Sequence, residues 1–134
     1  MKLRWGILGT GMIARIVAPQ IRASATGELL AVASRRAETA EQFGAQFAVP
    51  RRYGSYAALL ADRDVDAVYI SLPNSLHAEW ILRCARAGKH VLCEKPFTSN
   101  HAEAMVVLDA LRDSRVCVME ACMYRGHPQT ARRV

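Results

Sequence analysis

The chain has 134 residues, of which 51% are hydrophobic, and this size and composition are typical of one globular domain. Its net charge is +6, but the basic residues are scattered and form no stripe, which argues against nucleic-acid binding. No apolar stretch approaches the roughly 18 residues of a membrane span, and no signal-cleavage pattern follows Lys2 and Arg4. We therefore expect a cytoplasmic protein that binds neither nucleic acid nor a membrane.

The cysteine pattern argues against disulfides and metal sites. Cys84, Cys93, Cys117 and Cys122 form no C-x-x-C pair, and no histidine lies at a spacing that suits zinc. Such cysteines are typical of reduced thiols in a cytosolic protein. We expect no metal site.

Apolar runs alternate with amphipathic stretches, which is the pattern of βαβ units in a parallel sheet covered by helices on both faces. The pattern predicts an α/β fold with a doubly wound, mostly parallel sheet of the Rossmann type. Gly88 ends the fourth helix, and Asn100 with Glu103 resembles a capping box at the fifth. The predicted strands are 3–8, 28–33, 66–71, 90–93 and 116–120, with a candidate edge strand at 51–53, and the predicted helices are 12–24, 37–47, 55–61, 75–87 and 100–113.

A glycine-rich turn follows the first predicted strand. Residues 9–14 spell G-x-G-x-x-A and open a stretch with helical spacing. In a dinucleotide-binding turn the first glycine allows a tight turn, the second lets backbone N–H groups approach a pyrophosphate, and a small residue lets helix and strand pack closely. The alternative is an ordinary tight turn. The candidate cofactor-binding residues here are Gly9, Thr10, Gly11, Met12 and Ile13.

The end of the second strand indicates which dinucleotide would bind. An NAD site carries an acidic residue about 20 positions after the glycine motif, where it binds the ribose 2′-hydroxyl. This chain has Ser34, Arg35 and Arg36 there. A hydroxyl and two guanidinium groups can bind a 2′-phosphate that a carboxylate would repel. The sequence therefore predicts NADP(H) in preference to NAD(H), with a solvated start of the next helix as the alternative for the arginines.

A loop after the next predicted strand lies at the same edge of the sheet, where ligands of open α/β sheets bind. After strand 66–71, Leu72, Pro73, Asn74 and His77 are placed where a nicotinamide ribose would lie. In the alternative interpretation, Asn74 or its neighbour Ser75 caps the next helix and His77 lies on the surface of that helix.

A fourth loop follows the strand at 90–93 and consists of Glu94, Lys95 and Pro96. Reduction of a carbonyl by hydride transfer leaves an alkoxide that needs a proton, and a lysine ammonium near the nicotinamide can supply it. Lys95 is therefore the candidate catalytic residue, and burial beside a cofactor would favour release of its proton. The alternative is a surface pair of Glu94 and Lys95 before a turn set by Pro96.

These motifs together resemble the Gfo/Idh/MocA oxidoreductases, a family that includes glucose-fructose oxidoreductase, inositol dehydrogenase and dihydrodiol dehydrogenase. Glu94-Lys95-Pro96 is the most distinctive motif. The resemblance implies an NADP(H)-dependent oxidoreductase that acts on a sugar, polyol or dicarbonyl by hydride transfer. The segments that carry it keep the family's order and spacing over essentially the whole chain: 9–14, 34–36, 72–77, 88–96 and 119–121.

The resemblance also implies roles for individual residues. Lys95 matches the family lysine that contacts substrate and nicotinamide, and Glu94 and Pro96 complete its motif. Tyr124 and Arg125 match a variable segment near the active site and are candidate substrate contacts. Further matches are Ser34 and Arg35, which correspond to the pair that binds the 2′-phosphate in NADP-preferring members, and Pro73, Asn74 and His77, which correspond to the loop lining the cofactor cleft.

The resemblance covers only the cofactor half of such enzymes. Family members carry a second, C-terminal α+β domain that supplies much of the sugar pocket and the usual dimer surface. We expect residues 1–120 to form the dinucleotide-binding domain and 121–134 to begin a linker toward that missing domain. The chain alone is then expected to turn over weakly or not at all and to expose apolar surface for self-association. A non-catalytic NADP(H)-binding regulatory or assembly module is the alternative function.

Overall fold

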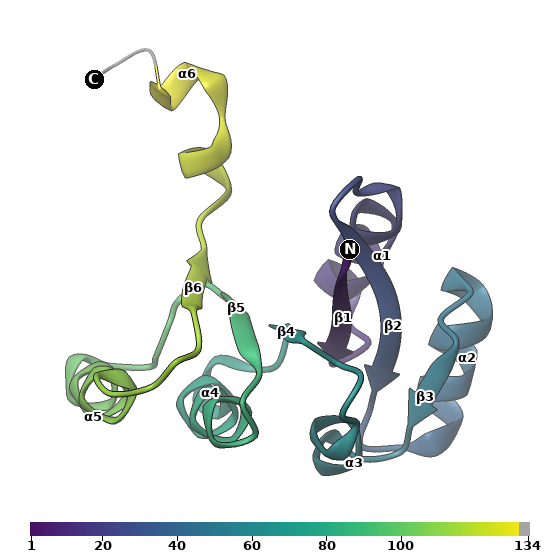
Figure 1. The fold of residues 1–134 in the computed structure, drawn as a ribbon, viewed down its shortest axis with the longest axis horizontal. Coiled ribbons are helices and arrows are strands. Elements are labelled where there is room, and N and C mark those ends of the chain that lie inside the picture. Colours follow the sequence, from purple (N-terminus) through teal and green to yellow (C-terminus); the bar gives the residue numbers. More distant parts are fainter. Residues whose placement is uncertain (132–134) are drawn as a thin grey trace.

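The computed structural model describes residues 1–131 as a six-stranded parallel sheet with helices on both faces (Figure 1). The strands lie in the order β3-β2-β1-β4-β5-β6, and every neighbouring pair is parallel. This order confirms the predicted α/β class with a Rossmann-type sheet. The strand bounds are β1 Leu3–Leu8, β2 Gly27–Ala33, β3 Arg51–Tyr53, β4 Ala67–Ile70, β5 His90–Glu94 and β6 Val118–Ala121.

Helices fill the connections between the strands, close to the positions that hydrophobic periodicity predicts. Among the described residues, no helix combines the length and the apolar character needed to cross a bilayer. The long helices are α1 Met12–Ala23, α2 Ala37–Phe47, α3 Tyr56–Ala61, α4 His77–Arg86 and α5 His101–Leu111, and the short ones are the 3-10 turns η1 Asn74–Leu76 and η2 Met123–Gly126 and the single turn α6 Pro128–Ala131.

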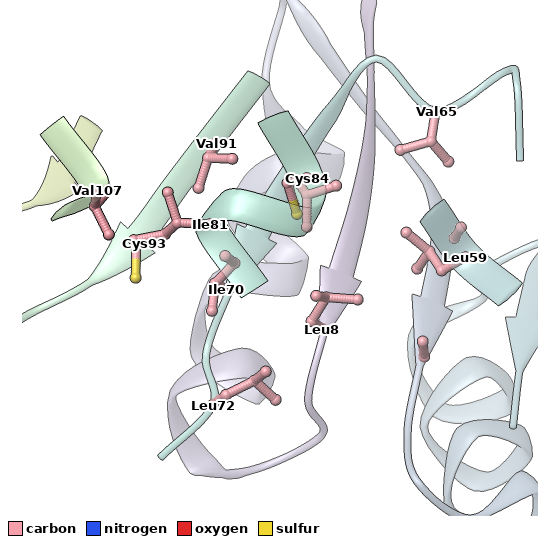
Figure 2. Close-up of a cluster of buried hydrophobic side chains, with 13 residues drawn as sticks. Leu8, Leu59, Val65, Ile70, Leu72, Ile81, Cys84, Val91, Cys93 and Val107 are labelled. Atoms are coloured by element: carbon pink, nitrogen blue, oxygen red, sulfur yellow. The ribbon is translucent and has the colours of Figure 1, made fainter. Parts of the chain in front are cut away.

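Side chains alternate along the buried strands and divide the core into two layers. Leu8 and Ile70 belong to the layer shared with α3, α4 and α5, where Figure 2 shows them beside Ile81 of α4. Their neighbours Ile7 and Tyr69 belong to the layer shared with α1 and α2. The central strands are continuous apolar runs because both of their faces are covered.

Two predicted helix ends are confirmed. The Asn100 side chain accepts a hydrogen bond from the Glu103 N–H at 2.9 Å, and the Glu103 carboxylate accepts one from the Ser99 N–H at 3.0 Å. Gly88 follows α4 with a φ of +72°, a conformation that costs glycine little. A side-chain cap at Asn100 therefore starts α5, and the backbone conformation of Gly88 ends α4, where the sequence indicates.

The end of the chain departs from the prediction. The sequence shows no periodicity after residue 120, whereas β6 runs to Ala121 and is followed by η2 and α6. Elements of a single turn are too short to give a periodic pattern. Figure 1 shows this segment, in yellow, extending away from the sheet beyond β6. The linker assignment of 121–134 stays a prediction, and residues 132–134 lie outside the described part of the chain.

The Asp62 carboxylate anchors the loop between α3 and β4, at the edge of the sheet where the strands begin. It accepts hydrogen bonds from the Arg51 guanidinium at 2.7 Å, the Tyr53 hydroxyl at 2.8 Å and the Asp64 N–H at 2.9 Å. Burial opposes ionisation of Asp62, but these bonds outweigh it and lower the pKa of the carboxyl. The ionised carboxylate thus stabilises the fold.

Lys89 holds the same loop from the start of β5. It is 6% exposed, and its ammonium donates to the main-chain oxygens of Asp62 at 2.6 Å and Val65 at 2.7 Å. Burial lowers the pKa of Lys89. This lysine of the 88–96 motif therefore has a structural part, at the edge opposite the predicted ligand loops.

We predict that Asp62→Ala lowers the free energy of unfolding by about 2 kcal/mol, because Arg51 and Tyr53 lose a shared acceptor. Urea unfolding at neutral pH measures this loss. The control Asp113→Ala removes an exposed carboxylate and should stay within about 0.5 kcal/mol of the wild type. Because folding lowers the pKa of Asp62, its stabilisation is present above about pH 4 and is lost as pH falls through the folded pKa. Equal stability of the two variants would contradict the anchoring role.

Candidate functional site

Four loops that the sequence predicts to bind a ligand meet at one edge of the sheet. They follow the carboxyl ends of β1, β2, β4 and β5, which are adjacent in the order β2-β1-β4-β5. The direction of winding reverses between β1 and β4, and such a switch point opens a crevice for ligands. The loops brought together are 9–13, 34–36, 72–77 and 94–96.

Gly9 makes the first of these turns possible. Its φ is +99°, and a Cβ there would lie 2.9 Å from the Ser71 hydroxyl oxygen and 3.1 Å from the Ser71 carbonyl oxygen. The Gly9 N–H donates to the Ala33 carbonyl at 3.0 Å, and the Ser71 N–H donates to the Leu8 carbonyl at 3.0 Å. Only glycine suits this backbone, which ties together the ends of β1, β2 and β4.

Gly11 has a different structural role from Gly9. Its φ is −73°, which any residue can adopt, and a Cβ there would meet no atom within 4 Å. It is the N-cap of α1, whose end has no side-chain cap and no acidic residue in its first turn. The Arg15 N–H donates to the Gly11 carbonyl, so the N–H groups of residues 12–14 have no acceptor within the helix. Open space before such groups, at the positive end of a helix dipole, fits a phosphate.

The turn after β2 presents two guanidinium groups. Arg35 and Arg36 are exposed, and Arg35 lies beside the Tyr56 hydroxyl, where it partly offsets the rise in the pKa of Tyr56 caused by burial. Ser34 is only 8% exposed, and its hydroxyl accepts a long hydrogen bond from the Arg36 N–H at 3.5 Å. Ser34 thus shapes the turn, while the arginines face solvent.

The loop after β4 does not cap the following helix. Neither η1 nor α4 has a side-chain cap, so the capping alternative for Asn74 and Ser75 is wrong. Pro73 and Asn74 are exposed, whereas Leu72 is 6% exposed and belongs to the core. The Leu72 side chain is therefore not available to a ligand, and Pro73 and Asn74 present the accessible side chains.

His77 is fully buried. Its Nδ1 lies 2.7 Å from the Pro96 carbonyl oxygen, and its Nε2 lies 2.8 Å from the Leu72 carbonyl oxygen. Burial contradicts the alternative that His77 lies on the surface of the helix, and its assignment to the cofactor site stays a prediction. The imidazole instead links the loop after β4 to the loop after β5. Its partners are main-chain oxygens of other segments, which a local pattern does not reveal.

Lys95 lies between two anchored neighbours. On one side, the Tyr69 hydroxyl donates to Glu94 Oε1 at 2.5 Å. Burial raises the pKa of Tyr69 and Glu94 raises it further, so this hydroxyl remains a donor. On the other side, His77 holds the Pro96 carbonyl. Glu94 faces Tyr69, which contradicts a surface pair with Lys95.

The Lys95 side chain itself is exposed. The described part of the chain therefore does not bury Lys95, although burial beside a cofactor is expected from the sequence. Tyr124 and Arg125 are also exposed and lie in η2, on the segment that leaves the sheet (Figure 1). Their role as substrate contacts stays a prediction.

Comparison with known proteins agrees with this site. Residues 3–122 match the oxidoreductase family with an NAD-binding Rossmann fold known as Gfo/Idh/MocA. The chain belongs to the Gfo/Idh/MocA family. The resemblance drawn from the glycine turn and the Glu-Lys-Pro motif is thus confirmed.

Members of this family with stated activities are similar to the chain. It is 48% identical to D-xylose 1-dehydrogenase (NADP(+)) 2 of Haloferax volcanii, over 97% of this chain and 40% of that protein. It is 44% identical to dTDP-3,4-didehydro-2,6-dideoxy-alpha-D-glucose 3-reductase of Actinomadura kijaniata, over 95% of this chain and 38% of that protein. The crystal structure of KijD10, a 3-ketoreductase from Actinomadura kijaniata in complex with NADP, matches with a TM-score of 0.93 and 40% identity, over 99% of this chain and 42% of that chain. This Gfo/Idh/MocA chain spans about 40% of the length of these relatives.

We predict different outcomes for the two glycines of the turn. Gly9→Ala should lower the free energy of unfolding by about 2 kcal/mol, because alanine is strained at a φ of +99° and its Cβ crowds Ser71. Gly11→Ala is the matched control and should stay within about 0.5 kcal/mol of the wild type, because its Cβ meets no atom. Urea unfolding of both variants measures the difference, and equal losses would refute the division of roles.

Proposed function

We propose that the chain is the cofactor domain of an NADP(H)-dependent oxidoreductase that acts on a sugar, polyol or dicarbonyl by hydride transfer. The observation that carries the proposal is the open, uncapped N-terminus of α1 at Gly11, on the same sheet edge as Arg35 and Lys95. The relatives support it, because one is an NADP(+)-dependent xylose dehydrogenase and a 3-ketoreductase structure holds NADP.

The strand order supports one direction for the cofactor along the edge. The pyrophosphate would lie on the α1 N-terminus, against the main chain of 9–13. The adenosine end would then point toward β2, where Arg35 and Arg36 would bind the 2′-phosphate. The nicotinamide end would point toward β4 and β5, where Pro73, Asn74 and Lys95 are exposed.

Lys95 would carry the acid–base chemistry. When bound, the nicotinamide supplies or accepts the hydride. In reduction, Lys95 Nζ would give a proton to the carbonyl oxygen of the substrate, and in oxidation its neutral amine would take the proton of the substrate hydroxyl. Tyr124 and Arg125 would contact the substrate from the segment beyond β6.

The chain covers only part of the length of its relatives, and this affects the activity expected of it alone. It spans about 40% of their length, and Lys95 is exposed within it. Substrate positioning and exclusion of water contribute much of an enzyme's rate. We therefore expect weak turnover or none from this chain alone, and an NADP(H)-binding module without catalysis is the second candidate function.

We predict that the chain binds NADPH at least about tenfold more tightly than NADH, because the 2′-phosphate gains charge-assisted hydrogen bonds. Arg35→Ala should remove most of this preference and leave NADH binding unchanged. Calorimetric titration at physiological salt measures the four affinities. Arg115→Ala, which removes an exposed arginine preceding β6, is the charge-matched control. Equal weakening of both nucleotides by Arg35→Ala would refute the 2′-phosphate site.

We predict that Lys95→Ala lowers any NADPH-dependent turnover at least about a hundredfold, because the proton donor is lost. NADPH affinity should fall by no more than about tenfold, because the contacts expected from Arg35 and the α1 N-terminus to the cofactor phosphates remain. Absorbance of NADPH with sugars and dicarbonyls measures turnover, with Lys2→Ala as the control. A Lys95→Ala variant that keeps its rate would refute the catalytic role, whereas a wild type that binds NADPH but stays at background rate would favour the module.

A further inference from the structure

One peptide group next to Lys95 is held at both ends. The Pro96 carbonyl oxygen lies 2.7 Å from Nδ1 of His77, which belongs to α4. The Phe97 N–H donates to Oε1 of Glu120, at the end of β6, at 2.7 Å. This oxygen and this N–H belong to the same peptide unit. A histidine and a carboxylate from different elements therefore hold a single peptide plane.

Each end of that peptide meets a partner of the opposite hydrogen-bonding kind. The Pro96 carbonyl oxygen only accepts, so the Nδ1 of His77 that faces it acts as the donor. The Phe97 N–H only donates, and a Glu120 carboxylate oxygen accepts from it. Hydrogen bonds to ionised groups are shorter and stronger than neutral ones.

The placement of Glu120 argues against a packing role. The residue is exposed and lies outside both clusters of the core. Its second oxygen accepts a hydrogen bond from the Cys122 thiol at 3.4 Å. The register of β6 aligns Glu120 with Cys93, two residues before Lys95. Hydrogen bonds therefore orient the Glu120 carboxylate, and the side chain does not contribute to the hydrophobic core.

We propose that Glu120 is a positioning residue for Lys95. By holding the Phe97 N–H while His77 holds the Pro96 carbonyl, it fixes the backbone that follows Lys95. The Tyr69–Glu94 bond fixes the residue before it. The orientation of the Lys95 side chain then depends on the Glu120 carboxylate, which takes no part in a catalytic step. The inference rests on the proposed function of Lys95 at the nicotinamide end of the cofactor.

The test compares Glu120→Ala, Glu120→Gln and the exposed-carboxylate control Asp113→Ala in this chain. Calorimetry gives the dissociation constants for NADPH and for 2′-phospho-ADP-ribose, which lacks the nicotinamide. Glu120→Ala should weaken NADPH roughly fivefold and leave 2′-phospho-ADP-ribose unchanged, because only the nicotinamide end reaches this loop. Glu120→Gln keeps an acceptor oxygen and should restore most of the NADPH affinity.

Amide hydrogen exchange at Phe97, followed by NMR, tests the bond without any ligand. Exchange should be roughly fivefold faster in Glu120→Ala than in the wild type, and close to the wild type in Glu120→Gln and Asp113→Ala. Unchanged exchange in Glu120→Ala would overturn the proposal. Equal weakening of both ligands would also overturn it, because it would indicate general loosening of the fold.

A wild type that binds neither ligand would overturn both the proposed function and the positioning role. In that case, faster Phe97 exchange in Glu120→Ala would show that the hydrogen bond exists although no cofactor binds. Failure of the proposed function is thereby distinguished from absence of the bond. Because Glu120 is exposed, its variants leave the core intact, and urea unfolding at the wild-type midpoint confirms that they fold.

Discussion

The parallel alignment of the strands is the constraint on which the rest of the structure depends. It places the carboxyl ends of β1, β2, β4 and β5 side by side, so loops far apart in sequence share one edge. Close packing at Gly9 and Ser71 leaves no room for a side chain there and aligns the ends of the strands. The switch point between β1 and β4, the place where open α/β sheets bind ligands, follows from this alignment.

The edge of the sheet where the strands begin contributes to stability, and the edge where they end carries the candidate functional groups. At the edge where strands begin, the Asp62 carboxylate pairs with Arg51, and the Lys89 ammonium donates to the main-chain oxygens of Asp62 and Val65. At the other edge, the α1 N-terminus lacks a cap, and Arg35 and Lys95 are exposed. Unsatisfied donors and cations gathered at one place do not help a domain to fold, and they are what a polyanionic cofactor requires.

Much of this arrangement can be predicted from the sequence, because it depends on local patterns. Hydrophobic periodicity predicts the strands and long helices, and the Asn100 cap and the glycine turn follow from local chemistry. Interactions between distant segments leave no such pattern. The burial of His77 and the hold of Glu120 on the Phe97 N–H become visible only once β4, β5 and β6 are aligned. The turns after β6 are too short to show a period.

In the function proposed above, these loops form one continuous NADP(H) site. Titration of the chain with NADPH, followed through its backbone amide NMR signals, tests this. We expect the signals of 9–13, 34–36, 72–77 and 94–97 to shift together along one binding curve, and those of 62–66 and Lys89, at the opposite edge, to stay unchanged. Shifts confined to a single loop, or strongest at the opposite edge, would contradict it.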